Sequence, residues 1–590
     1  MNAPAGRRIF HLYLIKPSHY DDDGYVIQWF KAAIPSNSLA VMYGLARDCD
    51  NRRVLGDDVE LKIVAIDETN ARVRADKIAA EFKKHPFGLV GLVGVQSNQF
   101  PRAVDIARPL REAGVPVMIG GFHVSGCRSM LPELPPDIQA AADMGISFFY
   151  GEAEGRFDRV LQDAANGALK PSYDYMNDLP GINETPMPFL PADVISRTVG
   201  AVTSFDAGRG CPFQCSFCTI INVQGRKSRF RSVDDIEAIV RANLKQGVRR
   251  FFITDDNLAR NKNWEAIFDR LAQIRRDEKF SLIIQVDTLC HRIPGFIEKA
   301  AKAGVRRVYI GLENINPDNL LAAKKKQNRI AEYRQMLLDW KHVGCTIYAG
   351  YIIGFPHDTL ESTLRDIEII KRELPLDLLE FFFLTPLPGS EDHQKLYNAG
   401  VPMDPDMNKY DLEHLTTAHS KMSREDWERA YKLAWETYYS WDHMETVMRR
   451  AGACGISPGN MMFLLAWFAL CIKLEKVHPL QGGYLRRKVR NDRRPGMPIE
   501  HPLVFYPKYV ADLVWKHVGL AKYLWRMVKV RNSIKRDPNR RAYMDTALTP
   551  VSEDELETLE MFTSTDSTRH AADHARKLHA TAANVVTAAE

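Results

Sequence analysis

The chain has 590 residues, of which 45% are hydrophobic and 26% charged, a composition that excludes a disordered or collagen-like protein. At about 100 to 200 residues per domain it has room for about three to five domains, which excludes a small disulfide-stapled scaffold. Its 79 Lys and Arg against 74 Asp and Glu give a net charge of +5, too small to indicate a nucleic-acid-binding protein by itself.

The distribution of apolar residues and cysteines indicates a cytoplasmic protein. No stretch reaches the roughly 18 apolar residues of a membrane span, and the first residues contain no apolar run of secretory length. The nine cysteines are spread thinly, which fits a reducing compartment better than a disulfide framework. Clustered cysteines in such a chain need a metal or catalytic explanation.

Residues 1–170 are predicted to form a doubly wound, Rossmann-like α/β domain. Short apolar runs alternate with amphipathic stretches, and continuous apolar strands separated by helices indicate a parallel sheet covered on both faces. The predicted strands are 9–15, 59–66, 88–95, 115–119 and 147–150. A ligand of such a domain lies beyond the carboxyl ends of its strands. The proline-containing segment 171–198 is predicted as a linker.

A second alternating series, residues 199–398, predicts a partial (β/α)6 barrel. Its strand-like runs are 199–205, 250–254, 282–286, 305–310, 346–353 and 378–384. The active site of a barrel of this kind is built from the loops that follow the strands. Residues 399–590 lack strand patterns and predict a helical C-terminal domain, with a frayed tail after Ser552.

Three cysteines, Cys211, Cys215 and Cys218, follow the first barrel strand at CxxxCxxC spacing. Chance would produce this triple somewhere in the chain with odds of roughly 0.2%. A buried helical face and a zinc site are the alternatives. The glycines 208 and 210 indicate an irregular loop rather than a core helix, and the chain has no second CxxC pair for zinc. Three thiolates can hold three irons of a 4Fe-4S cube and leave the fourth iron open.

This motif on a six-unit barrel resembles the radical S-adenosylmethionine (SAM) superfamily, over residues 199–392. The resemblance implies that the three cysteines are the catalytic metal ligands, that SAM chelates the fourth iron, and that reductive cleavage yields a 5'-deoxyadenosyl radical. It also implies an external one-electron donor of the flavodoxin or ferredoxin type. Residues at strand ends are then expected to contact SAM: Asp255, Asp256, Asn257, Gln285 and Glu313. Acidic residues after strands are otherwise more often helix caps or solvated groups.

Three loops of the N-terminal domain, beside such a barrel, resemble the cobalamin-binding domain of one radical SAM subclass. The resemblance implies that cobalamin contacts these loop residues: Gln96, Ser97, Asn98, Gln99, Gly120, Gly121, His123, Gly151 and Glu152. A domain that uses the glycines only for tight turns is the alternative. The Asp-x-His-x-x-Gly motif is absent, so the lower face of cobalt is expected to meet the loop 96–100.

The combined resemblance implies a cobalamin-dependent radical SAM C-methyltransferase. One SAM methylates cob(I)alamin, and a second supplies the radical that removes hydrogen from an unactivated carbon, which then takes methyl from methylcobalamin. The expected substrate is a small molecule or a lipid-like molecule. Two alternatives stay open: a ring-forming or rearranging enzyme of the same subclass, and a cobalamin or iron-sulfur sensor without turnover.

The positive charge is concentrated in the C-terminal domain. Residues 471–541 contain 18 Lys and Arg and 5 Asp and Glu, so this segment carries +13 and the rest of the chain -8. Basic segments with aromatic residues such as Trp515 and Trp525 are suited to a lipid interface, and the apolar run 461–472 is too short to span a bilayer. Peripheral contact at the inner membrane face is one prediction. A solvated basic face that closes the barrel is another, and nucleic acid is a less favoured third.

Overall fold

A parallel six-stranded sheet forms the N-terminal domain in the computed structural model, which describes residues 7–550, 552 and 558–587. The strand order is β3-β1-β4-β5-β6-β7. The strands are β1 (Arg8–Lys16), β3 (Val59–Asp67), β4 (Gly88–Leu92), β5 (Val117–Gly120), β6 (Ser147–Tyr150) and β7 (Ser172–Asp174). β7 lies in the segment predicted as a linker and extends the sheet beyond residue 170.

Helices cover both faces of this sheet because its strands are apolar on both sides. Leu12 and Leu14 share a core with one pair of helices, whereas Tyr13 and Ile15 point to the opposite core. The first pair is α1 (Asn37–Asn51) and α6 (Phe157–Ala165), and the second face carries α2 (Ala75–Lys84), α3 (Phe100–Glu112), α4 (Phe122–Met130) and α5 (Pro136–Asp143). The predicted doubly wound fold is confirmed.

The second sheet has the order β15-β14-β13-β12-β11-β8, with every neighbouring pair parallel. Its strands are β8 (Val202–Phe205), β11 (Arg250–Ile253), β12 (Ser281–Val286), β13 (Val305–Glu313), β14 (Thr346–Ile353) and β15 (Leu378–Phe383). The main surrounding helices are α9 (Val233–Lys245), α10 (Trp264–Asp277), α11 (Phe296–Ala303), α13 (Ile330–His342) and α14 (Leu360–Glu373). Within the described residues β8 and β15 remain sheet edges, so the barrel is partial, as predicted.

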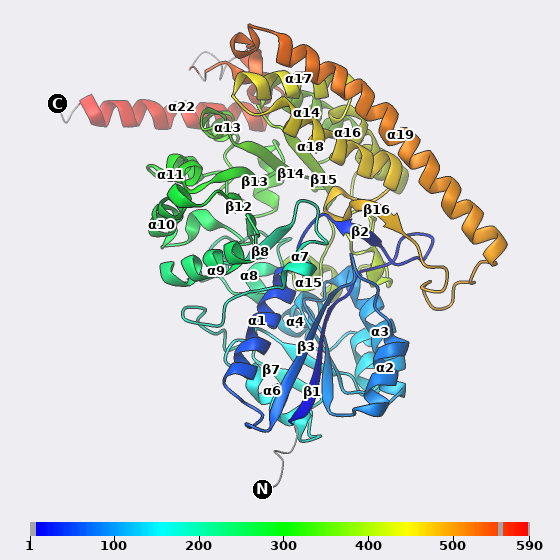
Figure 1. The fold of residues 1–590 in the computed structure, drawn as a ribbon. Coiled ribbons are helices and arrows are strands. Elements are labelled where there is room, and N and C mark those ends of the chain that lie inside the picture. Colours follow the sequence, from blue (N-terminus) through cyan, green and yellow to red (C-terminus); the bar gives the residue numbers. More distant parts are fainter. Residues whose placement is uncertain (1–6, 551, 553–557, 588–590) are drawn as a thin grey trace.

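Helices dominate the C-terminal part, which lies against the barrel (Figure 1). They are α16 (Arg424–Tyr438), α17 (Trp441–Ala453), α18 (Pro458–Leu470), α19 (Pro502–Arg536), α21 (Glu560–Thr563) and α22 (Asp566–Thr587). The apolar run 461–472 is core, since Leu465 and Phe468 of α18 are buried. No helix in the described part of the chain combines the length and apolar character needed to cross a membrane.

Two features of the C-terminal part differ from the sequence expectations. The tail is not simply frayed: α21 buries Met561 and Phe562, and the Met561 amide donates to Glu373 of α14 at 2.9 Å. Two apolar anchors in a polar stretch give little periodic signal, which is why the composition suggested fraying. In addition, β16 (Gly483–Arg487) pairs antiparallel with β2 (Gln28–Ala32), which joins the C-terminal part to the loop after β1.

Candidate functional site

A cavity lies at the carboxyl edge of the first sheet, beneath α1 and α6. Its wall has both apolar and polar residues, including Leu12, Leu14, Asn37, Ser38, Val41, Gly94, Met118, Gly120, Gly121, Ser125, Phe149, Gly151, Glu152, Glu154 and Arg209. A side chain at Gly121, whose φ is +149°, would come within 2.1 Å of the Val95 amide nitrogen. Glycine is therefore required there for two loops to approach each other.

The predicted cobalamin contacts divide into two groups. Gly120, Gly121, Gly151 and Glu152 line the cavity, but His123 and the loop 96–99 are absent from its lining. His123 is buried elsewhere: its Nδ1 lies 3.2 Å from Ser97 Oγ, and its ring packs 4.5 Å from that of Phe100.

Asn98 and Gln99 are buried with that second group, and Gln99 Oε1 accepts from the Gln96 amide at 3.1 Å. Asn37 and Ser38 of α1 are cavity residues that sequence reasoning missed. Asn and Ser are common in the first turn of any helix, so their presence there did not indicate a site. Only the fold shows that they line the same cavity as Gly120 and Gly121.

The three cysteines occupy an irregular loop after β8, as the glycines predict. Gly210 has φ +86°, and a side chain there would meet the Lys227 and Gly225 carbonyl oxygens within 3.0 Å. The Cys211 amide donates to Gly225 O at 3.2 Å, and Gln327 Nε2 lies 3.4 Å from Cys215 Sγ. The loop is thus fixed by contacts on both sides of the motif.

The loop supplies three thiols, which is the donor set of an open 4Fe-4S cube. Within the described residues, no group of three or more His, Cys, Asp or Glu side chains is arranged to hold a metal ion. A zinc site needs its ligands around one point, whereas a 4Fe-4S cube spreads three thiolates over three irons. Burial raises the pKa of Cys211 to about 11 and that of Cys218 to about 12, so both are protonated thiols near neutral pH when no metal is bound.

The predicted SAM residues gather beside this loop. Asp255 Oδ1 accepts from the amides of Ala207 and Gly208 at 2.6 and 2.7 Å. Asp256 Oδ2 accepts from the Gly210 amide at 3.2 Å. Burial raises the pKa of both carboxyls to about 7. Both side chains therefore fix the backbone that leads into Cys211.

The three remaining SAM candidates each contact another residue of the protein. Asn257 Nδ2 donates to Asp287 Oδ2 at 2.7 Å, and Gln285 Nε2 reaches the Asp255 carbonyl at 3.4 Å. Glu313 ends β13 with φ +65°, a conformation that costs a non-glycine residue of order 1 kcal/mol, and forms an ion pair with Lys325. The structure brings all five candidates to one edge of the barrel.

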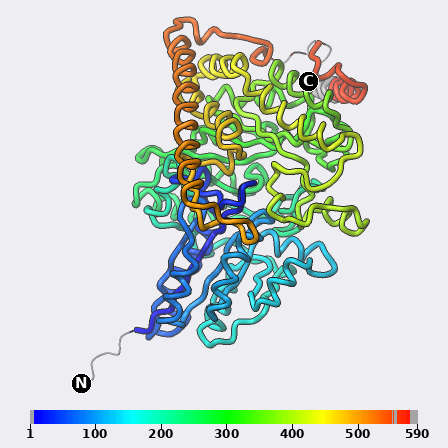
Figure 2. Tube along the Cα trace, turned by 90° about the vertical axis from the view of Figure 1, so that its right-hand side faces the viewer, coloured from blue at the N-terminus to red at the C-terminus, as the bar shows by residue number. Residues whose placement is uncertain are grey.

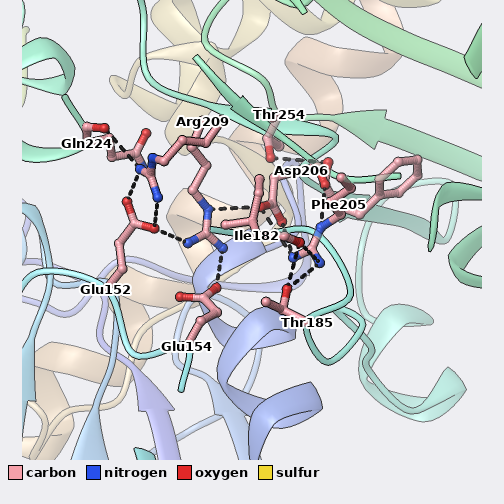
Figure 3. Close-up of polar contacts among 12 residues, drawn as sticks. Glu152, Glu154, Ile182, Thr185, Phe205, Asp206, Arg209, Gln224 and Thr254 are labelled. Carbon is pink, nitrogen blue, oxygen red and sulfur yellow. Dashed lines mark hydrogen bonds and ion pairs between the residues drawn. The ribbon is translucent and has the colours of Figure 1, made fainter. Parts of the chain in front are cut away.

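A buried charge network joins this loop to the first sheet (Figure 3). Arg209, two residues before Cys211, donates to Glu152 at 2.7 Å, to Glu154 at 2.6 Å and to Asp206 at 2.8 Å. Arg229 also binds Glu152. Burial acts to raise the pKa of Asp206, but the nearby guanidinium groups outweigh it and lower this pKa to about 2.

The network places the carboxyl edges of the two sheets face to face. Glu152 and Glu154 follow β6, and Arg209 follows β8. Glu152 is therefore a residue of the domain interface as well as of the cavity wall. The ion pairs were missed because Arg209 stands between two glycines in the sequence, and no local sequence pattern indicates a partner in another domain.

Comparison with known proteins decides the family. Residues 207–370 match the model of the radical SAM superfamily. The bacteriochlorophyllide d C-8(2)-methyltransferase of Chlorobaculum tepidum is 30% identical over 345 residues, which cover 55% of this chain and 72% of that protein. The hopanoid C-2 methylase of Rhodopseudomonas palustris is 22% identical over 53% of this chain and 58% of its own length.

This chain belongs to the radical SAM superfamily. Two solved structures share its fold. OxsB, a cobalamin-dependent SAM radical enzyme, has a TM-score of 0.52 at 15% sequence identity. The match covers 89% of this chain and 84% of the OxsB chain. TsrM of Kitasatospora setae, a radical SAM methyltransferase solved with cobalamin and a 4Fe-4S cluster, has a TM-score of 0.51 at 14% sequence identity. The match covers 72% of this chain and 85% of the TsrM chain. The predicted family and fold class are confirmed, and membership assigns this enzyme a 4Fe-4S cluster and SAM.

The residues at both edges fit bound cofactors. The motif supplies three thiols and no fourth cysteine at the loop, which is the donor set of an open cube. At the other edge, Asn37 Oδ1 is shielded from solvent and has no hydrogen-bond partner among the described residues, although it lines the glycine-walled cavity. An unsatisfied buried acceptor of this kind points to a bound group with hydrogen-bond donors.

A buried carboxyl in the barrel lumen has no counterpart in the sequence predictions. Glu380 of β15 stands beside Gly350 of β14 in the sheet register, on the same face as Phe382. Both of its carboxyl oxygens are buried without a hydrogen-bond partner within the described residues. Burial raises its pKa to about 8, so the folded protein keeps it neutral near pH 7.

Glu380→Gln is expected to become more stabilising as pH rises. The ordinary pKa of 4.5 applies to the unfolded chain, so wild-type stability is complete below that pH and falls as pH rises toward 8, by on the order of 4 kcal/mol. The thermal midpoints of both proteins between pH 5 and 8.5 measure this difference. Glu436→Gln, at an exposed residue of α16, is the control, and parallel curves for wild type and Glu380→Gln would contradict a neutral Glu380.

Proposed function

We propose that this radical SAM enzyme methylates an unactivated carbon of a small-molecule or lipid-like substrate, with cobalamin as an additional cofactor. The observation that carries the proposal is that two sheet edges face each other. The three-cysteine loop follows β8, the glycine-walled cavity lies after β5 and β6, and Arg209 beside the loop bonds to Glu152 in the cavity wall. When bound, the cluster would supply the electron that cleaves SAM reductively, and cobalamin would supply the methyl group for a carbon held between the two edges.

The residues of the chain would divide this work. Cys211, Cys215 and Cys218 hold the cluster, and the strand-end residues Asp255, Asp256, Asn257, Gln285 and Glu313 surround SAM. Gly120, Gly121 and Gly151 allow the corrin to approach the backbone closely. The two buried edges exclude water from the space between them, which protects a reactive intermediate.

The names of two relatives support a substrate of the small-molecule or lipid-like class. One relative is named for a bacteriochlorophyllide and another for a hopanoid. We propose a substrate of similar character, reduction by a flavodoxin- or ferredoxin-type donor, and peripheral contact of the basic C-terminal domain with the inner face of the membrane.

Turnover with methyl-deuterated SAM tests the reaction. The enzyme is reconstituted without oxygen with iron, sulfide and hydroxocobalamin, reduced by dithionite, and given extract from a strain that lacks it. We expect 5'-deoxyadenosine, S-adenosylhomocysteine and one product with a labelled methyl group by mass spectrometry. 5'-Deoxyadenosine without a labelled product would favour ring formation or rearrangement, and absence of both would favour a sensor.

A further inference from the structure

Helix α19 carries an apolar stripe with no protein partner among the described residues. This helix runs along the outer edge of the molecule in Figure 1 and lies on the side that faces the viewer in Figure 2. Its C-terminal half packs inward through Tyr523, Met527 and Ile534, whereas Phe505 is the buried residue of its first half. Most of the remaining apolar residues of that first half are exposed, among them Leu503, Val510 and Val514.

The stripe is continuous along the helix. At 100° per residue, Leu503, Val510, Val514, Ala521 and Trp525 fall within a sector of about 60° and extend over about 33 Å. Val510 and Val514 are 56% and 58% exposed, and Trp525 is 65% exposed. Exposed apolar residues scattered singly are normal, but a contiguous band of this length marks an interaction surface.

The charges beside the stripe select its partner. Residues 502–536 contain eight Lys and Arg and one acidic residue, Asp512, which pairs with Lys516 at 2.8 Å. Lys529 Nζ stands 3.3 Å from the Trp525 ring, at the border of the stripe. A second copy of the chain would bring the same cations together, and nucleic acid makes no use of an aliphatic band. An anionic bilayer surface satisfies both features.

We infer that the outward face of α19, from Leu503 to Lys529, docks in the interface of an anionic membrane, with the stripe toward the acyl chains and the lysines at the headgroups. The inference rests on the proposed membrane contact and assigns it to one helix face. Trp515 belongs to this helix and also lines a cavity of about 760 Å³ between α19 and the loop after β1. The docking face is thus next to a cavity that reaches into the protein.

Vesicle flotation of the full-length protein tests the assignment. We expect the protein to float with vesicles of phosphatidylglycerol and phosphatidylcholine, and only weakly with phosphatidylcholine alone. Val510→Glu with Val514→Glu should reduce binding about tenfold or more, because two apolar contacts are replaced by charge. Lys522→Ala and Lys529→Ala should each reduce it about fivefold on the anionic vesicles. Leu321→Glu, at an exposed residue of α12 (Pro317–Ala322), is the matched control and should bind like wild type.

Failure to float with the anionic vesicles, or equal flotation of the Val510/Val514 double variant, overturns the inference. A dimer in solution that this double variant dissociates would assign the stripe to a second copy. Tighter binding to an RNA or DNA oligonucleotide than to vesicles would assign it to nucleic acid. Formation of 5'-deoxyadenosine without lipid is measured on the same proteins. An unchanged yield in the double variant separates failure of docking from failure of the proposed reaction.

Discussion

Replacement of any one of Cys211, Cys215 and Cys218 by alanine is expected to abolish 5'-deoxyadenosine formation completely. In the proposed site each thiolate holds a different iron of the cube, so the loss of one removes the geometry that leaves a single iron open to SAM. The brown chromophore of the reconstituted protein should fall in parallel. Product quantification by mass spectrometry and iron analysis of each variant check both effects.

The control for the cysteine variants is Cys345→Ala. This thiol is buried in the same barrel, with its Sγ 3.4 Å from the Val305 carbonyl oxygen, outside the loop 211–218. It should retain iron and turnover. Circular dichroism separates cluster loss from unfolding. A variant of Cys211, Cys215 or Cys218 that keeps full iron content and turnover would remove that residue from the site.

Replacement of Arg209 by methionine is expected to destabilise the protein by about 3 to 5 kcal/mol. The side chain is 8% exposed and forms ion pairs with three buried carboxylates, so its loss leaves Glu154 buried without this cation. The largest effect is expected at Glu154. Burial acts to raise the pKa of this carboxyl, and Arg209 lowers it below the ordinary value. Chemical denaturation followed by tryptophan fluorescence and by circular dichroism measures the loss.

Two variants make the Arg209 prediction specific. Arg52→Met removes an exposed arginine paired with Asp158 at 2.7 Å and should cost less than about 1 kcal/mol. Addition of Glu154→Leu to Arg209→Met should recover part of the loss, because the unpaired charge is removed with its partner. Equal losses for Arg209→Met and Arg52→Met would show that the domain interface does not depend on this network.

The strands of both sheets are predictable because each is a short apolar run between helices. The runs 147–150 and 346–353 coincide with β6 and β14. The pairing of β2 with β16 is not predictable, since Gln28–Ala32 and Gly483–Arg487 are short, mix apolar with polar residues, and lie far apart in the sequence. Long-range pairing of such short segments leaves no periodic signal.

In the candidate site, too, some features are predictable from the sequence and others are not. The cysteine spacing indicates the cluster loop from sequence alone, because the chemistry fixes the residue type at each position. The environment of Arg209 and the neutral Glu380 depend on which groups the fold brings against them. His123 stands at the expected strand end, yet its side chain turns into a buried cluster with Ser97 and Phe100. Sequence position gives the loop but not the direction of the side chain.

Electron paramagnetic resonance of the anaerobically reconstituted, dithionite-reduced protein tests whether the three thiols hold an open cluster. We expect a reduced 4Fe-4S signal that changes shape when SAM is added, because SAM would bind the iron that no cysteine holds. The triple Cys211, Cys215 and Cys218 alanine variant should show no such signal. A protein without iron-sulfur resonance, or with a signal that SAM leaves unchanged, would contradict an open cluster held by these three thiols.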